Sequence, residues 1–208
     1  MIIISHRGYW IDNSEKNTNL SFNRSFRLGF GVETDLREFN GNLVISHDIP
    51  NENAILIDDF FKLYTSQSES LLALNIKSDG LQSILKNKLE EFNIHNYFVF
   101  DMSVPDSIGY INNGISFFSR QSEYEMVPIF YDQSEGIWLD SFNNEWFDLE
   151  LIINHIENGK KVAIVSSELH GRNQMNLWEF IKRNDLHRLE NIILCSDFPE
   201  MASKYFNK

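Results

Sequence analysis

The sequence has little cysteine, little positive charge and no long apolar run, and each scarcity excludes a class of protein. The single Cys195 excludes an intramolecular disulfide and a multi-cysteine zinc site. Lys and Arg number 18 against 30 Asp and Glu, and the formal charge of −12 makes nucleic acid or an anionic membrane surface an unexpected partner. No apolar run approaches the roughly 18 residues of a membrane span and no charged leader precedes one. We therefore expect a cytoplasmic protein that begins at Met1 and does not insert into a membrane.

Two motifs of common enzymes are also missing. The chain has neither the Gly-x-Ser-x-Gly elbow of serine hydrolases nor a glycine-rich nucleotide-binding loop. No Pro-rich linker, low-complexity tract or change of composition divides the 208 residues, which suit one domain spanning 1–208.

What the sequence does contain is a regular alternation of apolar strand segments and helical stripes. Phenylalanine recurs every fourth residue at Phe22, Phe26 and Phe30, which is typical of a helix face. Eight segments predict strands, namely IIIS, GVETDLREF, LLALNIK, YFVFDMS, ISFFS, GIWLDSF, KVAIVSS and NIILCSD. This pattern predicts an α/β fold, a compact (β/α)8 TIM barrel, with a doubly wound open sheet as the alternative.

Polar residues at the strand ends favour the barrel. Barrel enzymes carry their chemistry at the carboxyl ends of the strands. The predicted strands end at His6, Asp35, Lys77, Asp101, Asp140, Glu168 and Asp197. Polar residues also mark the points where strands meet loops, and that interpretation accounts for part of the set.

The first candidate site residues follow from two short stretches. In "SHRG", His6 and Arg7 end a strand, and the planar guanidinium of Arg7 suits a phosphate or carboxylate. In "VETDL", Glu33 and Asp35 lie two apart on a strand, so their side chains share one face. Two neighbouring carboxylates repel each other unless a cation or a proton lies between them, which predicts a divalent cation.

A hairpin is expected to bring a second histidine to these acids. The sequence "NGN" after Phe39 predicts a turn. A three-residue turn pairs Phe39 with Leu43 and places His47 opposite Asp35, whereas a two-residue turn places His47 opposite Thr34. We predict the three-residue turn, because it gathers Glu33, Asp35 and His47 in one site. Two imidazoles beside a metal-bound phosphate then serve as base and acid.

These residues and their order resemble the glycerophosphodiester phosphodiesterase family, within the phosphatidylinositol-phospholipase-C-like barrels. The matching segments are HRG at 6–8, EKNTNLSF at 15–22, ETD at 33–35, HD at 47–48, NIK at 75–77 and CSDFP at 195–199. The resemblance implies that His6 and His47 are the acid/base pair and that Arg7 and Lys77 contact the phosphate. It further implies that Glu33 and Asp35 bind a divalent cation, Mg²⁺ or Ca²⁺.

Three departures from the family pattern limit this interpretation. The family's third carboxylate ligand is Asn75 here, which offers a neutral oxygen. Asp101, Asp140 or Glu168 could compensate from other strand ends. Lys16 is inserted in the Glu-Asn-Thr segment, which weakens the match at Glu15. The stretch SSELHGR is unusual for the family. It carries Glu168, His170 and Arg172, which either bind the substrate or form a structural ion-pair cluster.

The sequence therefore predicts a metal-dependent hydrolase of a water-soluble glycerophosphodiester or a glycerol-phosphate-linked compound. The alternatives are a catalytically impaired barrel that binds a sugar, phosphate or protein partner, and a sphingomyelinase-D-like phospholipase. Direct hydrolysis or a cyclic phosphate intermediate, and the oligomeric state, are left open. His95, His155 and His187 are predicted to be solvated surface residues, and Cys195 an inert core thiol.

Overall fold

The computed structural model describes residues 1–207, and the chain divides into two compact units. One unit is Ser5–Phe117, and the other joins Met1–Ile4 to the chain from Phe118 onward. The strand β1 contributes its first residues to one unit and its last residues to the other. The single domain expected over 1–208 stays a prediction.

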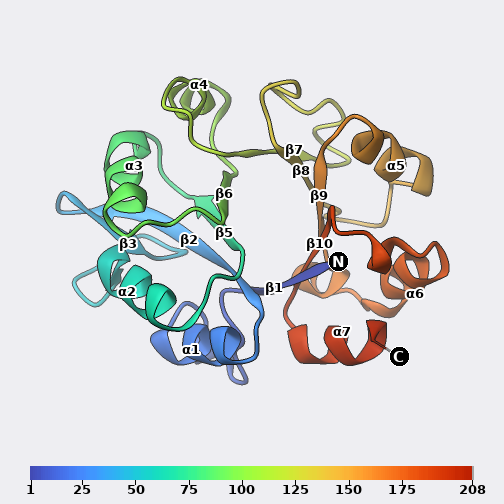
Figure 1. The fold of residues 1–208 in the computed structure, drawn as a ribbon, viewed down its shortest axis with the longest axis horizontal. Coiled ribbons are helices and arrows are strands. Elements are labelled where there is room, and N and C mark those ends of the chain that lie inside the picture. The colour runs from blue at the N-terminus through green and yellow to red at the C-terminus, as the bar shows by residue number, and fades with distance from the viewer. Residues whose placement is uncertain (208) are drawn as a thin grey trace. The chain divides into compact units, whose positions relative to one another are not determined.

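The unit Ser5–Phe117 is built on parallel strands covered by helices. Strand β2 pairs in parallel with β5, and β5 with β6, while β3 and β4 add antiparallel pairings on the other side of β2. Figure 1 shows α1, α2 and α3 beside these strands. The elements are β1 (Ile2–His6), η1 (Asn13–Glu15), α1 (Asn19–Arg27), β2 (Gly31–Phe39), β3 (Asn42–Ile45), β4 (Ile55–Leu56), α2 (Ile57–Gln67), β5 (Leu72–Ile76), α3 (Gln82–Glu91), β6 (Tyr97–Phe100) and α4 (Val104–Asn112).

Local sequence explains the first helix of this unit. Thr18 and Ser21 form a capping box that begins α1, since each side chain bonds the other's backbone N–H. The predicted phenylalanine stripe is confirmed for Phe22 and Phe26, which are buried against Phe60 with ring centroids 4.7 and 6.0 Å apart, whereas Phe30 is buried beyond the end of the helix. Aromatic packing of this kind fixes α1 and α2 on the sheet.

The hairpin that follows β2 differs from the prediction. Phe39 pairs with Asn42 and Leu36 with Ile45, so the turn has two residues, Asn40 and Gly41. Both have positive φ, 50° and 79°, as a type I′ turn requires. Asn-Gly takes this conformation readily and its twist matches the strands, so the three-residue turn was the wrong prediction. The register now places His47 opposite Thr34.

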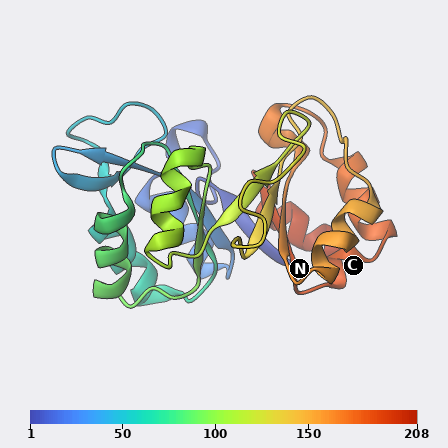
Figure 2. The same ribbon diagram turned by 90° about the horizontal axis from the view of Figure 1, so that it is seen from above.

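The other unit is also a parallel sheet with helices. Strands β7 to β10 pair in parallel in sequence order, and β10 continues to the start of β1. Figure 2 shows its helices, coloured orange to red, along these strands. The elements are β7 (Phe118–Gln121), β8 (Gly136–Leu139), α5 (Leu149–Glu157), β9 (Lys161–Val165), η2 (Ser167–His170), α6 (Met175–Arg183), η3 (Leu186–Arg188), β10 (Ile192–Ser196) and α7 (Pro199–Phe206).

Two sequence predictions in this unit have different outcomes. Cys195 is fully buried in β10, which confirms a core thiol. His155 is only 3% exposed, so its predicted surface location is wrong. Its Nδ1 is 2.9 Å from the Tyr131 hydroxyl and its Nε2 is 2.8 Å from Oε1 of Gln121, which satisfies both ring nitrogens inside the protein. Burial lowers the pKa of His155 below its ordinary value.

The α/β class predicted from the sequence is confirmed, with parallel strands and helices in both units. The strand pairings do not by themselves establish a closed ring of eight strands, and the barrel's closure stays a prediction. Among residues 1–207, none of the helices has the length and apolar character needed to cross a bilayer.

Candidate active site

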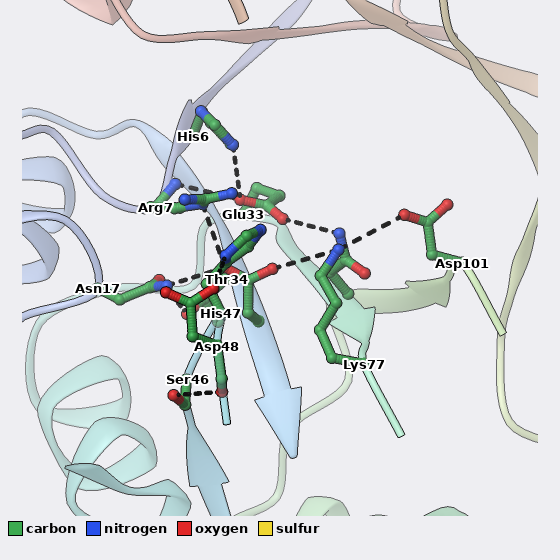
Figure 3. Close-up of polar contacts among 12 residues, drawn as sticks. His6, Arg7, Asn17, Glu33, Thr34, Ser46, His47, Asp48, Lys77 and Asp101 are labelled. Atoms are coloured by element: carbon green, nitrogen blue, oxygen red, sulfur yellow. Dashed lines mark hydrogen bonds and ion pairs between the residues drawn. The ribbon is translucent and has the colours of Figure 1, made fainter. Parts of the chain in front are cut away.

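A cluster of polar side chains in the unit Ser5–Phe117 centres on two carboxylates of β2 (Figure 3). Glu33 and Asp35 are 2% and 1% exposed, on a strand whose first six residues are all buried. Both carboxylates contact Arg7, which donates its backbone N–H to Glu33 Oε2 at 3.1 Å and holds its Nε 3.2 Å from Asp35 Oδ2. The period of two along the strand thus brings both acids to one place, as predicted.

Two cations flank the acids. Arg7 follows β1 with a φ of 57°, which turns the chain immediately after the strand. Lys77 follows β5, and its Nζ lies 3.6 Å from Asp35 Oδ1 and 3.9 Å from Asp101 Oδ2. The side chains of both are about one-fifth exposed, at 21% for Arg7 and 23% for Lys77. The cluster therefore supplies local positive charge within an acidic protein.

His6 ends β1 next to the first acid. Its Nε2 lies 3.9 Å from Glu33 Oε2, and its side chain is 15% exposed. Gly8 allows the chain to leave here, because it has a φ of 81° and a Cβ at this position would lie 2.4 Å from the Ser21 hydroxyl oxygen. Only glycine fits this turn, so the "HRG" stretch is explained by geometry.

Glu33 and Asp35 repel each other in the buried, low-dielectric interior of the protein. Burial, followed by the charge of Asp35, raises the pKa of Glu33 to about 7, although His6, Arg7 and Lys77 oppose the shift. A carboxyl group with such a pKa at the end of parallel strands is typical of a functional site.

Asn75 lies beside the acids on the neighbouring strand. It pairs in register with Asp35, and its Nδ2 is 3.4 Å from Glu33 Oε1. Its Oδ1 and the Oδ1 of Asp35 are buried without a hydrogen-bond partner. Orphaned oxygens next to a second carboxylate have the chemistry that a hard divalent cation prefers, so Glu33, Asp35 and Asn75 fit such an ion.

The predicted fourth ligand has a different neighbour. Asp101 follows β6 with a φ of 67° and faces Lys77. Within residues 1–207, no group of three or more His, Cys, Asp or Glu side chains is arranged to hold a metal ion. A cation here would therefore depend on two carboxylates and the amide of Asn75, and Asp101 as a ligand stays a prediction.

The second histidine is placed differently from the prediction. His47 is 43% exposed, and Nδ1 of its ring is 2.9 Å from Asp48 Oδ1. Its backbone carbonyl accepts from Nε and Nη2 of Arg37, both at 3.1 Å. The residue before it, Ser46, donates its N–H to the carbonyl of Asp35 at 3.0 Å, so the hairpin still brings His47 to this end of β2.

One residue of the cluster, Asn17, belongs to the matching segment that begins at Glu15, but no role was predicted for it from the sequence. Asn17 donates from Nδ2 to Asp35 Oδ2 at 2.9 Å and accepts at Oδ1 from the Thr34 hydroxyl at 2.8 Å. The available signal was an Asn-Thr pair directly before the helix that Thr18 caps. Glu15, the tentative match in the same segment, forms an ion pair with Arg24 at 2.8 Å.

The remaining predicted substrate-binding residues, Glu168, His170 and Arg172, lie in the other unit and contact protein side chains there. His170 Nε2 is 2.7 Å from Asp140 Oδ1, and Arg172 Nη1 is 2.6 Å from Glu145 Oε1. Glu168 accepts from the Ser196 hydroxyl at 2.5 Å. These contacts are those of an ion-pair cluster, the second of the two alternatives, and substrate binding by Glu168, His170 and Arg172 stays a prediction.

The fold and this cluster define an α/β protein in which histidine, arginine, lysine and carboxylate side chains gather beside parallel strands. No protein-family model and no curated protein matches the sequence. Solved structures do match: a glycerophosphodiester phosphodiesterase from Agrobacterium tumefaciens has a TM-score of 0.74 and 13% identity, with 98% of this chain and 99% of that chain covered.

Two structures from Parabacteroides distasonis are also similar. A glycerophosphodiester phosphodiesterase has a TM-score of 0.72 and 14% identity, covering 99% of this chain and 96% of that chain. A glycerophosphoryl diester phosphodiesterase has a TM-score of 0.68 and 12% identity, covering 99% and 86%. At this level of identity the likeness establishes the fold, and the resemblance stated from the sequence is confirmed at that level.

Proposed function

We propose that the protein hydrolyses a phosphodiester of the glycerophosphodiester type with the help of a divalent cation. The observation that carries the proposal is the buried carboxylate pair of Glu33 and Asp35, flanked by Arg7, Lys77 and His6. The fold shared with glycerophosphodiester phosphodiesterases supports the substrate class. Mg²⁺ and Ca²⁺ both suit the all-oxygen donor set.

The positively charged residues of the cluster bind the phosphate. Arg7 and Lys77 bind the nonbridging phosphate oxygens, because their cationic groups line the same carboxylates and remain partly exposed. Glu33, Asp35 and Asn75 would hold the divalent cation, which would supply further positive charge at the phosphate when bound.

The two histidines move the protons. One removes a proton from a water molecule, or from a substrate hydroxyl next to the phosphate, as the new P–O bond forms. The other gives a proton to the departing alkoxide as the old P–O bond breaks, which releases an alcohol. Asp48 at Nδ1 of His47 orients that ring and leaves Nε2 for proton transfer, while Glu33 lies next to Nε2 of His6.

The test is a release assay on glycerophosphodiesters with Mg²⁺ or Ca²⁺, with EDTA as the metal-free control. We expect His6→Ala and His47→Ala to lower kcat by about 10²- to 10⁴-fold without loss of the folded state. Alcohol release that is equal in the wild type and both variants would contradict the proposal. Binding of a glycerophosphate by a folded protein without turnover would identify a binding module instead.

A further inference from the structure

Asn17 is joined to the acid cluster by both its backbone and its side chain. Its backbone N–H donates to the carbonyl of Arg7 at 2.9 Å, so the loop before α1 is tied to the end of β1. Its side chain then reaches β2 and contacts both Thr34 and Asp35. The side chain therefore bridges two consecutive residues of the strand that carries the acids.

The carboxylate of Asp35, which only accepts hydrogen bonds, decides which way the amide of Asn17 points, and the hydroxyl of Thr34 complements that orientation. A threonine hydroxyl at 2.8 Å from the amide oxygen donates to it, and Thr34 is fully buried. The amide oxygen is thereby engaged, and the NH₂ group faces Asp35 and donates at 2.9 Å. A reversed amide would set an oxygen against a buried carboxylate.

The consequence falls on the two oxygens of Asp35. Oδ2 receives Asn17 at 2.9 Å and lies 3.2 Å from Arg7 Nε, whereas Oδ1 is buried with no hydrogen-bond partner. Lys77 Nζ, at 3.6 Å, is the charge facing Oδ1. Oδ2 of the carboxylate thus accepts a hydrogen bond from Asn17 beside the charge of Arg7, whereas Oδ1 has no hydrogen-bond partner and faces the ammonium group of Lys77.

We propose that Asn17 is a positioning residue, held at its amide oxygen by Thr34, that fixes the carboxylate of Asp35 so that Oδ1 is the oxygen offered to the cation. The inference deepens the proposed function and rests on it for the identity of the ligand. The closest chemical precedent is the outer-shell partner of a metal ligand, whose loss typically weakens metal affinity by about 10- to 100-fold.

The backbone of Asn17 determines which variants are informative. Its φ is 56°, a left-handed conformation that strains alanine, so Asn17→Gly removes the amide without adding strain. Asn93→Gly is the matched control, because Asn93 has a φ of 55° on an exposed loop of the same unit. Thr34→Val removes the hydroxyl that holds the amide oxygen at nearly constant shape, and Thr34→Ser retains it.

The first measurement is Mg²⁺ binding by calorimetry together with kcat and KM. We expect Asn17→Gly to weaken Mg²⁺ binding by about 10- to 100-fold and to lower kcat more than it raises KM. Thr34→Val should change both quantities in the same direction, while Thr34→Ser and Asn93→Gly behave as wild type. Wild-type affinity and kcat in a folded Asn17→Gly variant would overturn the proposal.

A second measurement reads the geometry without cation or substrate. In the NMR spectrum of the metal-free protein, the side-chain NH₂ of Asn17 should exchange with water more slowly than that of Asn40 in the exposed turn. The protection should persist in Thr34→Ser and disappear in Thr34→Val. An unprotected Asn17 amide overturns the proposal, whatever the activity. Weaker Mg²⁺ binding by Asn17→Gly, in a protein whose wild type binds Mg²⁺ but releases no alcohol, supports the positioning role and contradicts the proposed function instead.

Discussion

Two polar clusters of this chain are built on opposite principles. The β2 cluster consists of His6, Arg7, Glu33, Asp35, Asn75 and Lys77. The β8–β9 cluster consists of Asp140, Glu145, Ser167, Glu168, His170 and Arg172. In the first, Asp35 lies 3.2 Å from Arg7 Nε and 3.6 Å from Lys77 Nζ, and Glu33 lies beside it and accepts the backbone N–H of Arg7. In the second, each carboxylate has its own donor at 2.5 to 2.7 Å.

The pKa values of the acids follow this difference. Burial and the neighbouring Asp35 raise the pKa of Glu33 to about 7. Burial would also raise the pKa of Glu145, but the hydrogen bond from Ser167 and the charge of Arg172 bring it below its ordinary value. An acid whose neighbours stabilise its charge holds a fold together, whereas an acid left in conflict with its neighbours is available for a ligand or a proton.

The largest expected effect comes from neutralising one acid in each cluster. We expect Glu33→Gln to lower kcat by at least about 10²-fold, because a charged oxygen is lost from the site. Its free energy of unfolding at pH 8 should change by no more than about 1 kcal/mol, since relief of the repulsion with Asp35 offsets the weaker bond from Arg7. Glu145→Gln should cost about 1–3 kcal/mol of stability and leave kcat within about twofold.

Kinetic assays and urea unfolding of both variants check this comparison. Glu145→Asp serves as a control, because it keeps the charge beside Arg172. If Glu145→Gln lost activity as severely as Glu33→Gln, the division between a functional and a structural cluster would be wrong.

A smaller effect is expected from pH, with opposite signs in the two units. The folded pKa of Glu33 is raised to about 7, so its contribution to stability is present at low pH and is lost as the pH rises through about 7. The folded pKa of His155 is lowered from 6.5, so its contribution is present above 6.5 and is lost as the pH falls below that value.

Urea unfolding in EDTA from pH 5 to pH 8.5 separates the two contributions. Relative to wild type, Glu33→Gln should gain stability as the pH rises, and His155→Gln should gain stability as the pH falls. Parallel pH profiles for the wild type and a variant would show that the substituted residue does not titrate differently in the folded and unfolded states.

Local sequence rules predicted the part of the site that depends on strand geometry. Glu33 and Asp35 share a face because side chains alternate along a strand, and His6 and Lys77 meet them because the carboxyl ends of parallel strands gather at one edge. The length of the turn before His47 was mispredicted, and one residue more or less in a turn changes every cross-strand pair beyond it.

Contacts between segments far apart in sequence account for the other misses. Asn17 contacts Asp35 because a hydrogen bond to the carbonyl of Arg7 holds its loop there, and no periodicity in the sequence predicts such a contact. His155 lies on a helix with polar neighbours, and only the packing of Tyr131 and Gln121 against it removes it from solvent. Patterns of hydrophobicity predict which face of a helix or strand is buried. They do not predict which polar residue, distant in the sequence, contacts that face.

The smallest expected effect compares a half-buried arginine, Arg37, with an exposed one, Arg188. Arg37 donates twice to the carbonyl of His47, whereas Arg188 lies 3.1 Å from Asp185 on the surface of the other unit. Because a hydrogen bond contributes about 0.5–1.5 kcal/mol and about 1.4 kcal/mol corresponds to tenfold, we expect Arg37→Ala to lower kcat by about 3- to 10-fold. Arg188→Ala should leave kcat unchanged and change the free energy of unfolding by no more than about 0.5 kcal/mol. A folded Arg37→Ala variant with wild-type kcat would indicate that the β2–β3 hairpin holds His47 in place without this clamp.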